Sequence, residues 1–366
     1  MNRPSLPPPG APIAWRTSRC APFATQERWW AAVRRDLLPQ ASDPMTIALE
    51  GCPALRFALG GRATRFAIGL PTHDHLSLAD VAVADQLAVQ RIGPALDTLL
   101  QAPGDGARRT RPLAWRAARI PDDSALLAAA RLDASSGRWA CHPVAASAWF
   151  ELDNGPLPVP GKLRRNLQRL NRALQSLGEV HIEVHDRRDP TALAQAFDDF
   201  LRLEASGWKG AAGTNGGPGT AIAGDPRLLS FYRGLLDEDE DALHPQIALL
   251  RLDGRTIAAK YGLRSGDTLS LLKIAYDETY AAQSPGSQLL LGLMTQAQAA
   301  GITRLSLVTC PAWAARWRPL SAPVWHVTRY ADSPGGRALA RWDRTARRVR
   351  ARLGRLRSTL RRTPSA

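Results

Sequence analysis

Apolar side chains in the second half of the chain recur at helical spacing in three segments. In residues 161–178 they form one stripe that faces away from a set of Arg, and Gly178 ends the pattern: Leu163, Leu167, Leu170, Leu174 and Leu177. Residues 189–206 and 225–236 each begin with Asp-Pro, the residues preferred at an N-cap and in a first helical turn. The pattern therefore predicts three helices, the first of them amphipathic and basic.

Short apolar runs between these helices favour strands. A strand is expected over residues 180–184, and three more over 246–252, 256–263 and 268–276. Asp253-Gly254 and Gly266-Asp267 separate the last three, as in tight hairpin turns. We therefore expect an antiparallel meander, followed by a helix over 284–300 and a closing strand over 302–308.

The first half shows a weaker mixed pattern. Thr25 is a candidate cap for a helix whose apolar positions include Trp29, Trp30, Val33 and Leu37. Strands are expected over 55–70 and 76–83 and a helix over 85–100, with a surface loop over 101–112. Residues 152–160 hold three Pro and one Gly and mark the preferred boundary. We expect a Pro-rich arm over 1–22, an α/β unit over 23–151, a second unit over 160–312 and a basic helix over 333–362.

Composition places the chain among globular proteins. Of its 366 residues 45% are hydrophobic and 22% are charged, which excludes intrinsic disorder, and the length favours two units. The four Cys form no CxxC pair, so neither a structural zinc site nor a disulfide framework is expected. The N-terminus lacks the apolar core of a signal peptide, and polar residues interrupt the longest uncharged stretch. We expect a cytoplasmic protein.

The basic charge is concentrated at the C-terminal end. The formal net charge is +15, and residues 333–366 carry eleven Arg against one acid, Asp343. Apolar residues there form a narrow helical stripe: Trp342, Ala346, Val349, Leu353, Leu356 and Leu360. Anionic lipid, nucleic acid and a partner helix are the three interpretations left open, and nucleic acid lacks any accompanying base-reading motif.

The sequence LEASGWKG, residues 203–210, is the first candidate site. Glu204 continues the apolar stripe of the preceding helix, and Trp208 and Lys209 follow within one turn. A carboxylate on a buried face favours a general base, because burial raises its pKa toward neutrality. A structural ion pair between Glu204 and Lys209 is the competing and favoured interpretation. The Gly-rich segment over 210–224 is either a lid or a flexible connection.

The sequence QSPGSQLLLGL, residues 283–293, is the second candidate site. Ser284 is a favoured N-cap and Pro285 suits the first helical position. The amides of Gly286, Ser287 and Gln288 are then expected to point out of the helix without intrahelical partners. Such a terminus attracts anions such as phosphate, although a capped surface helix has the same sequence features.

Other candidates are weaker. The two His of His73-Asp74-His75 lack a third metal ligand nearby, and a polar strand face explains them better. His181 and His185 share a strand face, and solvation or pairing with Glu neighbours explains them equally well. No nucleophile elbow supports a hydrolase triad. Trp313 and Trp317, on either side of Arg316, either cover a ligand or cap the core.

The order of these features resembles one branch of the GNAT superfamily. The basic helix, LEASGWKG, Gly-rich loop, meander, YDETYAAQSPGSQLL and closing strand are similar to acetyltransferases labelled BioF-like or cellulose-biosynthesis-type, over residues 160–310. The resemblance implies an α/β (α+β) GNAT fold, with two GNAT-like units in tandem. It also implies that acyl-CoA pyrophosphate binds at a Q/R-x-x-G-x-G/A turn, with which Gln283, Gly286 and Gln288 align. Gln288 departs from the small residue expected last.

The resemblance further implies direct attack of an amine on a thioester. It assigns Glu204 as base, Asp277 as second candidate, and Tyr280 or Tyr276 as proton donor to sulfur. The acyl-CoA turn comprises Gln283, Ser284, Gly286, Ser287 and Gln288, and Trp208 and Lys209 contact the substrate. Acetyl-CoA or another acyl-CoA is the expected co-substrate, and no metal is expected.

Three functions fit this resemblance. The first is an acyl-CoA-dependent N-acyltransferase, expected to be an acetyltransferase, acting on a small-molecule or sugar amine in polysaccharide or cell-envelope biosynthesis. The second is a Fem-type transferase that uses aminoacyl-tRNA, and the third is a catalytically silent module that binds partners. An anionic membrane surface is the expected partner of the C-terminal helix, which would place the protein at the inner face of the membrane, and nucleic acid is not expected as a partner.

Overall fold

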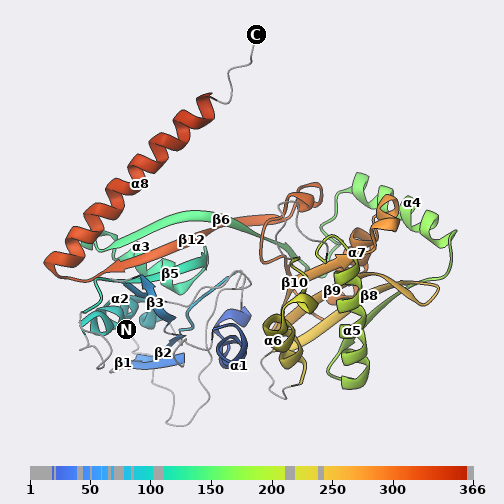
Figure 1. Ribbon diagram of the computed structural model, residues 1–366, viewed down its shortest axis with the longest axis horizontal. Coiled ribbons are helices and arrows are strands. Elements are labelled where there is room, and N and C mark those ends of the chain that lie inside the picture. Colours follow the sequence, from blue (N-terminus) through green and yellow to red (C-terminus); the bar gives the residue numbers. More distant parts are fainter. Residues whose placement is uncertain are drawn as a thin grey trace.

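The computed structural model describes residues 19, 22–38, 44–49, 52–58, 60–64, 67–69, 78–83, 86–101, 111–210, 219–237 and 243–360. Their main feature is a ten-stranded sheet in the order β3-β4-β5-β12-β6-β11-β10-β9-β8-β7 (Figure 1). The strands are β3 (Gly60–Thr64), β4 (Ala67–Gly69), β5 (Ala114–Pro121), β6 (Trp139–Glu151), β7 (Val180–Asp186), β8 (His244–Leu252), β9 (Arg255–Ser265), β10 (Thr268–Tyr276), β11 (Arg304–Ser306) and β12 (Leu320–Tyr330). Strands β1 (Pro44–Leu49) and β2 (Cys52–Ala58) form a separate antiparallel pair.

Helices cover the sheet in both halves. The α-helices are α1 (Glu27–Ala32), α2 (Gln86–Gln101), α3 (Ala125–Leu132), α4 (Gly161–Gln175), α5 (Pro190–Ser206), α6 (Pro226–Asp237), α7 (Pro285–Ala299) and α8 (Pro334–Leu360). Shorter helical segments are η1 (Pro22–Thr25), the π-helical η2 (Val33–Leu37), η3 (Ala134–Ser136), η4 (Ile222–Gly224), η5 (Glu278–Gln283) and η6 (Ala312–Trp317). The mixed α/β class expected from the sequence is confirmed.

The second half follows the predicted order of elements. The stripe of the basic helix α4 is buried at Leu163, Leu167, Leu170 and Leu174. The Asp189 side chain accepts a hydrogen bond from the Ala192 amide at 2.9 Å and so caps α5 as expected. Strands β8, β9 and β10 form the predicted antiparallel meander, with β7 at its outer edge. The expected closing strand is shorter than predicted, since β11 holds only Arg304–Ser306.

Two apolar clusters lie on opposite faces of this meander. Phe197, Phe200 and Tyr261 belong to the cluster under α1, α5 and α6. Leu250, Leu290 and Trp317 belong to the cluster under α4 and α7. A third cluster, under α2 and α3, fills the first half around the buried Trp115. The α1 segment of the first unit therefore packs into the core of the second half, while the third cluster lies in the first half.

The first half includes a strand from the end of the chain. Strand β12 pairs antiparallel with β5 and, over Leu320–Arg329, with β6. Strand β6 in turn pairs antiparallel with β11, so the long β6 and β12 join the two halves (Figure 1). Residues 320–330 therefore complete the sheet of the first unit, which a division at residues 152–160 did not anticipate.

Strands β10 and β11 separate soon after they meet. Their parallel pairing covers only Thr268–Ser270 and Arg304–Ser306, whereas β10 continues to Tyr276. Between Leu271 and Lys273, the pairing of β10 with β9 also shifts register at a β-bulge. On the β11 side, the last part of β10 therefore has no strand partner among the described residues, which leaves a gap in the sheet.

Helix α8 leaves the body of the protein after its first turns (Figure 1). Its root is fixed by Asp343, which accepts hydrogen bonds from Arg116 at 2.7 Å and from the Tyr330 hydroxyl at 3.0 Å. Ala340 is buried there, but Trp342 and Val349 are 72% and 50% exposed. None of the helices described combines the length and apolar character needed to cross a membrane.

Several sequence predictions fall where placement is not described. His73-Asp74-His75 lies outside the described residues, as do most of the arm over 1–22 and the middle of the Gly-rich segment, 211–218. The strand expected over 76–83 is described only from residue 78, where isolated bridges replace a continuous strand.

Candidate active site

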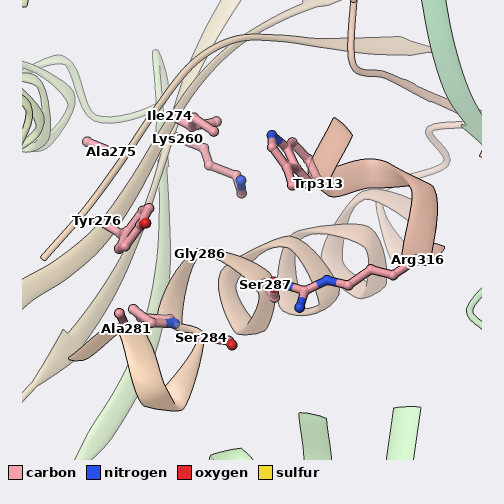
Figure 2. Close-up of a pocket in the computed structure, with 11 residues that line it drawn as sticks. Lys260, Ile274, Ala275, Tyr276, Ala281, Ser284, Gly286, Ser287, Trp313 and Arg316 are labelled. Carbon is pink, nitrogen blue, oxygen red and sulfur yellow. Dashed lines mark hydrogen bonds between the residues drawn. The ribbon is translucent and has the colours of Figure 1, made fainter. Parts of the chain in front are cut away.

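A cavity of about 200 Å³ lies where β10 and β11 separate. Its sheet side is lined by Ile274, Ala275 and Tyr276 of β10 and by Lys260 of β9. Ser284, Gly286 and Ser287, at the start of α7, line another side, and Trp313 and Arg316 of η6 close it (Figure 2). Four elements, β9, β10, α7 and η6, thus meet at the gap in the sheet.

The start of α7 differs in detail from the sequence prediction. Ser284 occupies the N-cap position but has a left-handed backbone (φ 51°, ψ 53°), and its side chain caps no amide. The amides of Ser287 and Gln288, expected to be unpaired, instead donate to the Ser284 carbonyl at 2.9 and 3.2 Å. The carbonyl of an N-cap residue accepts the first intrahelical hydrogen bond of a helix, so the bond from Gln288 is ordinary helix geometry. A non-glycine residue in the left-handed conformation of Ser284 is strained, a feature that clusters at functional sites.

Arg316 adds positive charge to this helix terminus. Its guanidinium donates a hydrogen bond to the Ser287 hydroxyl and so extends across the N-terminal end of α7 (Figure 2). The helix dipole and the guanidinium both attract an anion at the same place. The sequence predicts no role for Arg316, because η6 is brought to α7 only by the fold.

Space remains beside Gly286. A Cβ atom placed on Gly286 would meet only the Tyr276 ring, at an ordinary contact distance of 3.8 Å. The larger Gln288, which departs from the expected small residue, turns inward: it is 6% exposed, and its Nε2 donates to the Gln283 carbonyl at 2.8 Å. The Gln288 side chain therefore does not obstruct the approach to the turn.

The Glu204 carboxylate is fully engaged outside this cavity. It is 2% exposed; Oε1 accepts from Lys209 Nζ at 2.7 Å and Oε2 accepts from the Ile222 amide at 2.8 Å. Lys209 Nζ also donates to the Ile274 carbonyl at 2.6 Å, behind the cavity wall. The favoured ion-pair interpretation of the two residues is confirmed, and neither side chain lines the cavity.

The same cluster closes the ends of the Gly-rich segment. The Lys209 carbonyl accepts from the amides of Thr220 and Ala221 at 2.8 and 3.0 Å. Trp208, 55% exposed, donates its amide to Glu278 at 3.2 Å, and the Lys209 ammonium lies 5.4 Å from the Trp208 ring centroid. LEASGWKG therefore connects α5, the Gly-rich segment and the end of β10.

The remaining predicted catalytic residues lie at the rim. Asp277 accepts from the Thr279 amide at 3.0 Å and pairs with Arg255 at 2.6 Å. Burial works to raise the pKa of Asp277, but the Thr279 hydrogen bonds and the Arg255 charge outweigh it and hold the pKa below its ordinary value. Tyr280 packs against the cluster under α7, while Tyr276 lines the cavity. Of the two Tyr considered, Tyr276 is therefore the one within reach of a ligand there.

The buried lysine of the cavity was not predicted. Lys260 is 3% exposed, and its ammonium lies 5.8 Å from the centroid of the Trp313 ring. Burial, with a smaller effect of the Lys209 charge, lowers the pKa of Lys260 to about 8. In the sequence Lys260 is one polar position in an apolar run, and only the register of β9 opposite Ile274 shows where it points.

The two histidines form ion pairs and Trp317 packs in the core, whereas Trp313 lies at the cavity. His181 pairs with Glu179 at 2.8 Å and His185 with Glu183 at 3.1 Å. Trp317 is fully buried in the core, whereas Trp313 is 37% exposed at the cavity. Within the described part of the chain, no three His, Cys, Asp or Glu side chains gather as metal ligands.

Comparison with known proteins defines the class. Residues 161–317 match the family model described as an acetyltransferase (GNAT) domain, which spans α4 to η6 and contains the whole cavity. The second unit of this chain therefore matches a GNAT acetyltransferase domain, which supports the acyltransferase class expected from the sequence. No curated protein sequence matches the chain.

Solved structures share the fold over both units. The C-terminal domain of a candidate lysylphosphatidylglycerol synthetase from Agrobacterium fabrum is 16% identical, with a TM-score of 0.51 over 90% of this chain and 96% of that one. L-PGS from Bacillus licheniformis is 11% identical, with a TM-score of 0.52 over 87% of this chain and 96% of that one. FemX is 10% identical, with a TM-score of 0.52 over 85% of this chain and 93% of that one. At such identities the likeness concerns the fold alone.

Proposed function

We propose that this protein is an acyl-CoA-dependent N-acyltransferase that transfers an acetyl or other acyl group to an amine. The observation that carries the proposal is the cavity itself, which joins an anion-attracting helix terminus to an unpaired strand edge. A CoA thioester needs both features, since its phosphates are anionic and its carbonyl requires polar groups that stabilise an oxyanion.

Each side of the cavity binds a different part of the acyl donor. The turn of Ser284, Gly286 and Ser287, with Arg316 above it, holds the pyrophosphate. The thioester lies along Ile274–Tyr276 of β10, whose backbone faces no strand of the described residues on that side, and an amide there stabilises the oxyanion. Gln283 and Gln288 shape the turn through the hydrogen bond that the Gln288 side-chain Nε2 donates to the Gln283 carbonyl.

Glu204 has a positioning role in this proposal. Both of its oxygens are already hydrogen bonded, and it reaches the cavity only through Lys209, which holds the Ile274 carbonyl. Lys209 and Trp208 border the Gly-rich segment, and contact with the acceptor is the role proposed for them. Asp277 accepts from the Thr279 amide and so caps η5, the segment between β10 and α7, and Tyr276 replaces Tyr280 as the tyrosine within reach of sulfur.

Aminoacyl transfer from tRNA is the second candidate. It is favoured by the likeness of nearly the whole chain to L-PGS and FemX. The lining of the cavity argues against it: Lys260 and Arg316 are cationic, and the described lining holds no carboxylate. The α-ammonium of an aminoacyl group would meet like charge there, whereas a CoA thioester brings only anionic and neutral groups.

Helix α8 supports association with an anionic membrane. Its exposed Trp342 and Val349 belong to the predicted apolar stripe, and Arg residues border that stripe. Pairing two copies along the stripe would bring together two segments of eleven Arg and one acid each, which repel. Nucleic acid would engage the Arg and leave the stripe exposed. Anionic lipid would contact both the Arg residues and the apolar stripe. We therefore propose peripheral binding at the inner membrane surface through α8.

Calorimetric titration with acetyl-CoA tests the donor. We expect binding to the wild-type protein, loss of binding in Gly286→Phe, and unchanged binding in the control Gly224→Phe, since no atom of the described residues lies within 4 Å of a Cβ at Gly224. Binding of aminoacyl-tRNA without acetyl-CoA binding would favour the second candidate. Binding without transfer to any amine would indicate a catalytically silent module.

A further inference from the structure

Three of the four lysines of this protein lie beside Ile274, a residue of the cavity wall. Only four of its 48 basic residues are Lys, and the other basic residues are Arg. Three of the four surround one residue of β10: Lys209 donates to the Ile274 carbonyl, Lys260 is the register partner of Ile274, and Lys273 precedes it. An Arg stays protonated in proteins, whereas a buried Lys can release its proton. The choice of Lys at these positions therefore points to proton chemistry.

Lys260 is the member of this group that lines the cavity. Among the described residues its ammonium has an aromatic neighbour, Trp313, and no carboxylate partner. Glu204, the buried carboxylate of the cluster, accepts hydrogen bonds from Lys209 and the Ile222 amide. A buried ammonium without a counter-ion is costly, so the arrangement favours a ligand that brings negative charge.

Two cations lie near Lys260. They are Lys209, behind the wall, and Arg316, across the cavity. Lys273 on the neighbouring strand has its own pKa lowered to about 8 by burial and by Lys209, against an opposing effect of Glu204. Burial and Lys209 likewise bring the pKa of Lys260 to about 8, so that it holds a proton at neutral pH and loses it readily.

We propose that Lys260 is a catalytic residue that stabilises the thiolate leaving group of the acyl donor and gives it a proton. The proposal rests on the function proposed above. Figure 2 shows the Lys260 side chain directed from the sheet into the cavity toward Trp313, on the side away from the Ser284–Ser287 turn. A donor whose phosphates lie at that turn extends its thioester toward this amine.

The proton transfers balance within one turnover. The amine nitrogen of the acceptor attacks the thioester carbon, so that a C–N bond forms and the C–S bond breaks. The electron pair of the broken bond stays on sulfur, which takes the proton of the Lys260 ammonium. The proton lost by the attacking nitrogen returns to the neutral Lys260 amine. The products are an amide and a free thiol, and Lys260 is unchanged.

Free coenzyme A provides a test that needs no acceptor. Its thiol is titrated by ultraviolet absorbance of the thiolate while bound to the protein, with the desulfo-coenzyme A complex subtracted. In the wild-type protein we expect the bound thiol to ionise at least about one pH unit lower than in Lys260→Met, a tenfold change in its ionisation constant. Lys162→Met, at an exposed position on α4, is the matched control and should titrate like the wild type.

The outcomes separate this proposal from the one it rests on. Equal thiol titration in wild type and Lys260→Met, with coenzyme A bound to both, would overturn the role of Lys260 and leave the acyl-CoA site intact. Absence of coenzyme A binding to the wild type would overturn both. Should Lys260→Met fail to fold by circular dichroism, Lys260→Gln provides the same comparison, because it also removes the charge.

Discussion

The ammonium of Lys209 lies 2.7 Å from the Glu204 carboxylate, and the two side chains are 11% and 1% exposed. The pair is buried between the end of α5 and the middle of β10. Because the same ammonium holds the Ile274 carbonyl, the pair fixes the strand edge that lines the cavity. The relationship makes Glu204 a structural support of the site.

Replacing Glu204 should therefore lower the free energy of unfolding of the protein. Glu204→Ala leaves the buried Lys209 ammonium without its counter-ion and is expected to cost about 3–5 kcal/mol of unfolding free energy, measured by urea denaturation. Combining it with Lys209→Met should recover part of the loss. Exposed Glu179→Ala is the control. A stable Glu204→Gln protein that binds acyl-CoA but has lost turnover would instead indicate that Glu204 is the base.

Lys260→Met should stabilise the protein below pH 8. The pKa of Lys260 is lowered from 10.5 to about 8, so the unfolded chain binds this proton more tightly than the folded one. The cost of burying the charge, up to about 3 kcal/mol, is then fully present below pH 8 and disappears as the pH rises to 10.5. Unfolding free energies of wild type and Lys260→Met should converge over that range. A constant difference would contradict the lowered pKa.

Trp342 should contribute to lipid binding. Trp342→Gln is expected to weaken binding to anionic vesicles about tenfold in co-sedimentation, since burial of one large apolar side chain is worth roughly 1.5–3 kcal/mol. Binding should also fall with salt and be absent with zwitterionic vesicles. Leu132→Gln, which removes an apolar side chain 66% exposed on α3, is the control. Unchanged vesicle binding by Trp342→Gln would rule out the stripe as the contact surface.

Gly210 should tolerate no side chain. A Cβ atom there would overlap the Ala205 carbonyl oxygen, a backbone atom that cannot turn aside. Gly210→Ala is expected to lower the melting temperature by several degrees, because the turn that holds Lys209 must shift. At Gly224, at the other end of the Gly-rich segment, an added Cβ atom has no atom of the described residues within 4 Å. Gly224→Ala should therefore melt like the wild type. Equal melting of both variants would show that this turn is free to move.

The second half of the fold was predictable because its signals are local. The stripe of α4, the Asp189 cap of α5 and the Asp253-Gly254 turn each fix an element within a few residues. The long-range pairing was not predictable. Strand β12 joins β5 and β6 across about half the chain, and neither periodicity nor turn residues specify a partner at that distance.

The same contrast applies to the site. The turn around Gly286 was identified from its Ser-Pro-Gly sequence, and the Glu204–Lys209 ion pair was expected from their spacing. Lys260 and Arg316 were missed as site residues, since each is brought to the cavity by sheet register or by the return of η6 toward α7. The inward turn of Gln288 likewise depends on packing that sequence spacing does not show.

Calorimetric binding of acetyl-CoA to wild type and Gly286→Phe tests the central claim most directly. The account predicts saturable binding to the wild-type protein that Gly286→Phe abolishes and Gly224→Phe leaves unchanged, because only the first side chain fills the cavity beside Ser284 and Tyr276. Equal acetyl-CoA binding by wild type and Gly286→Phe, or no binding by either, would contradict it.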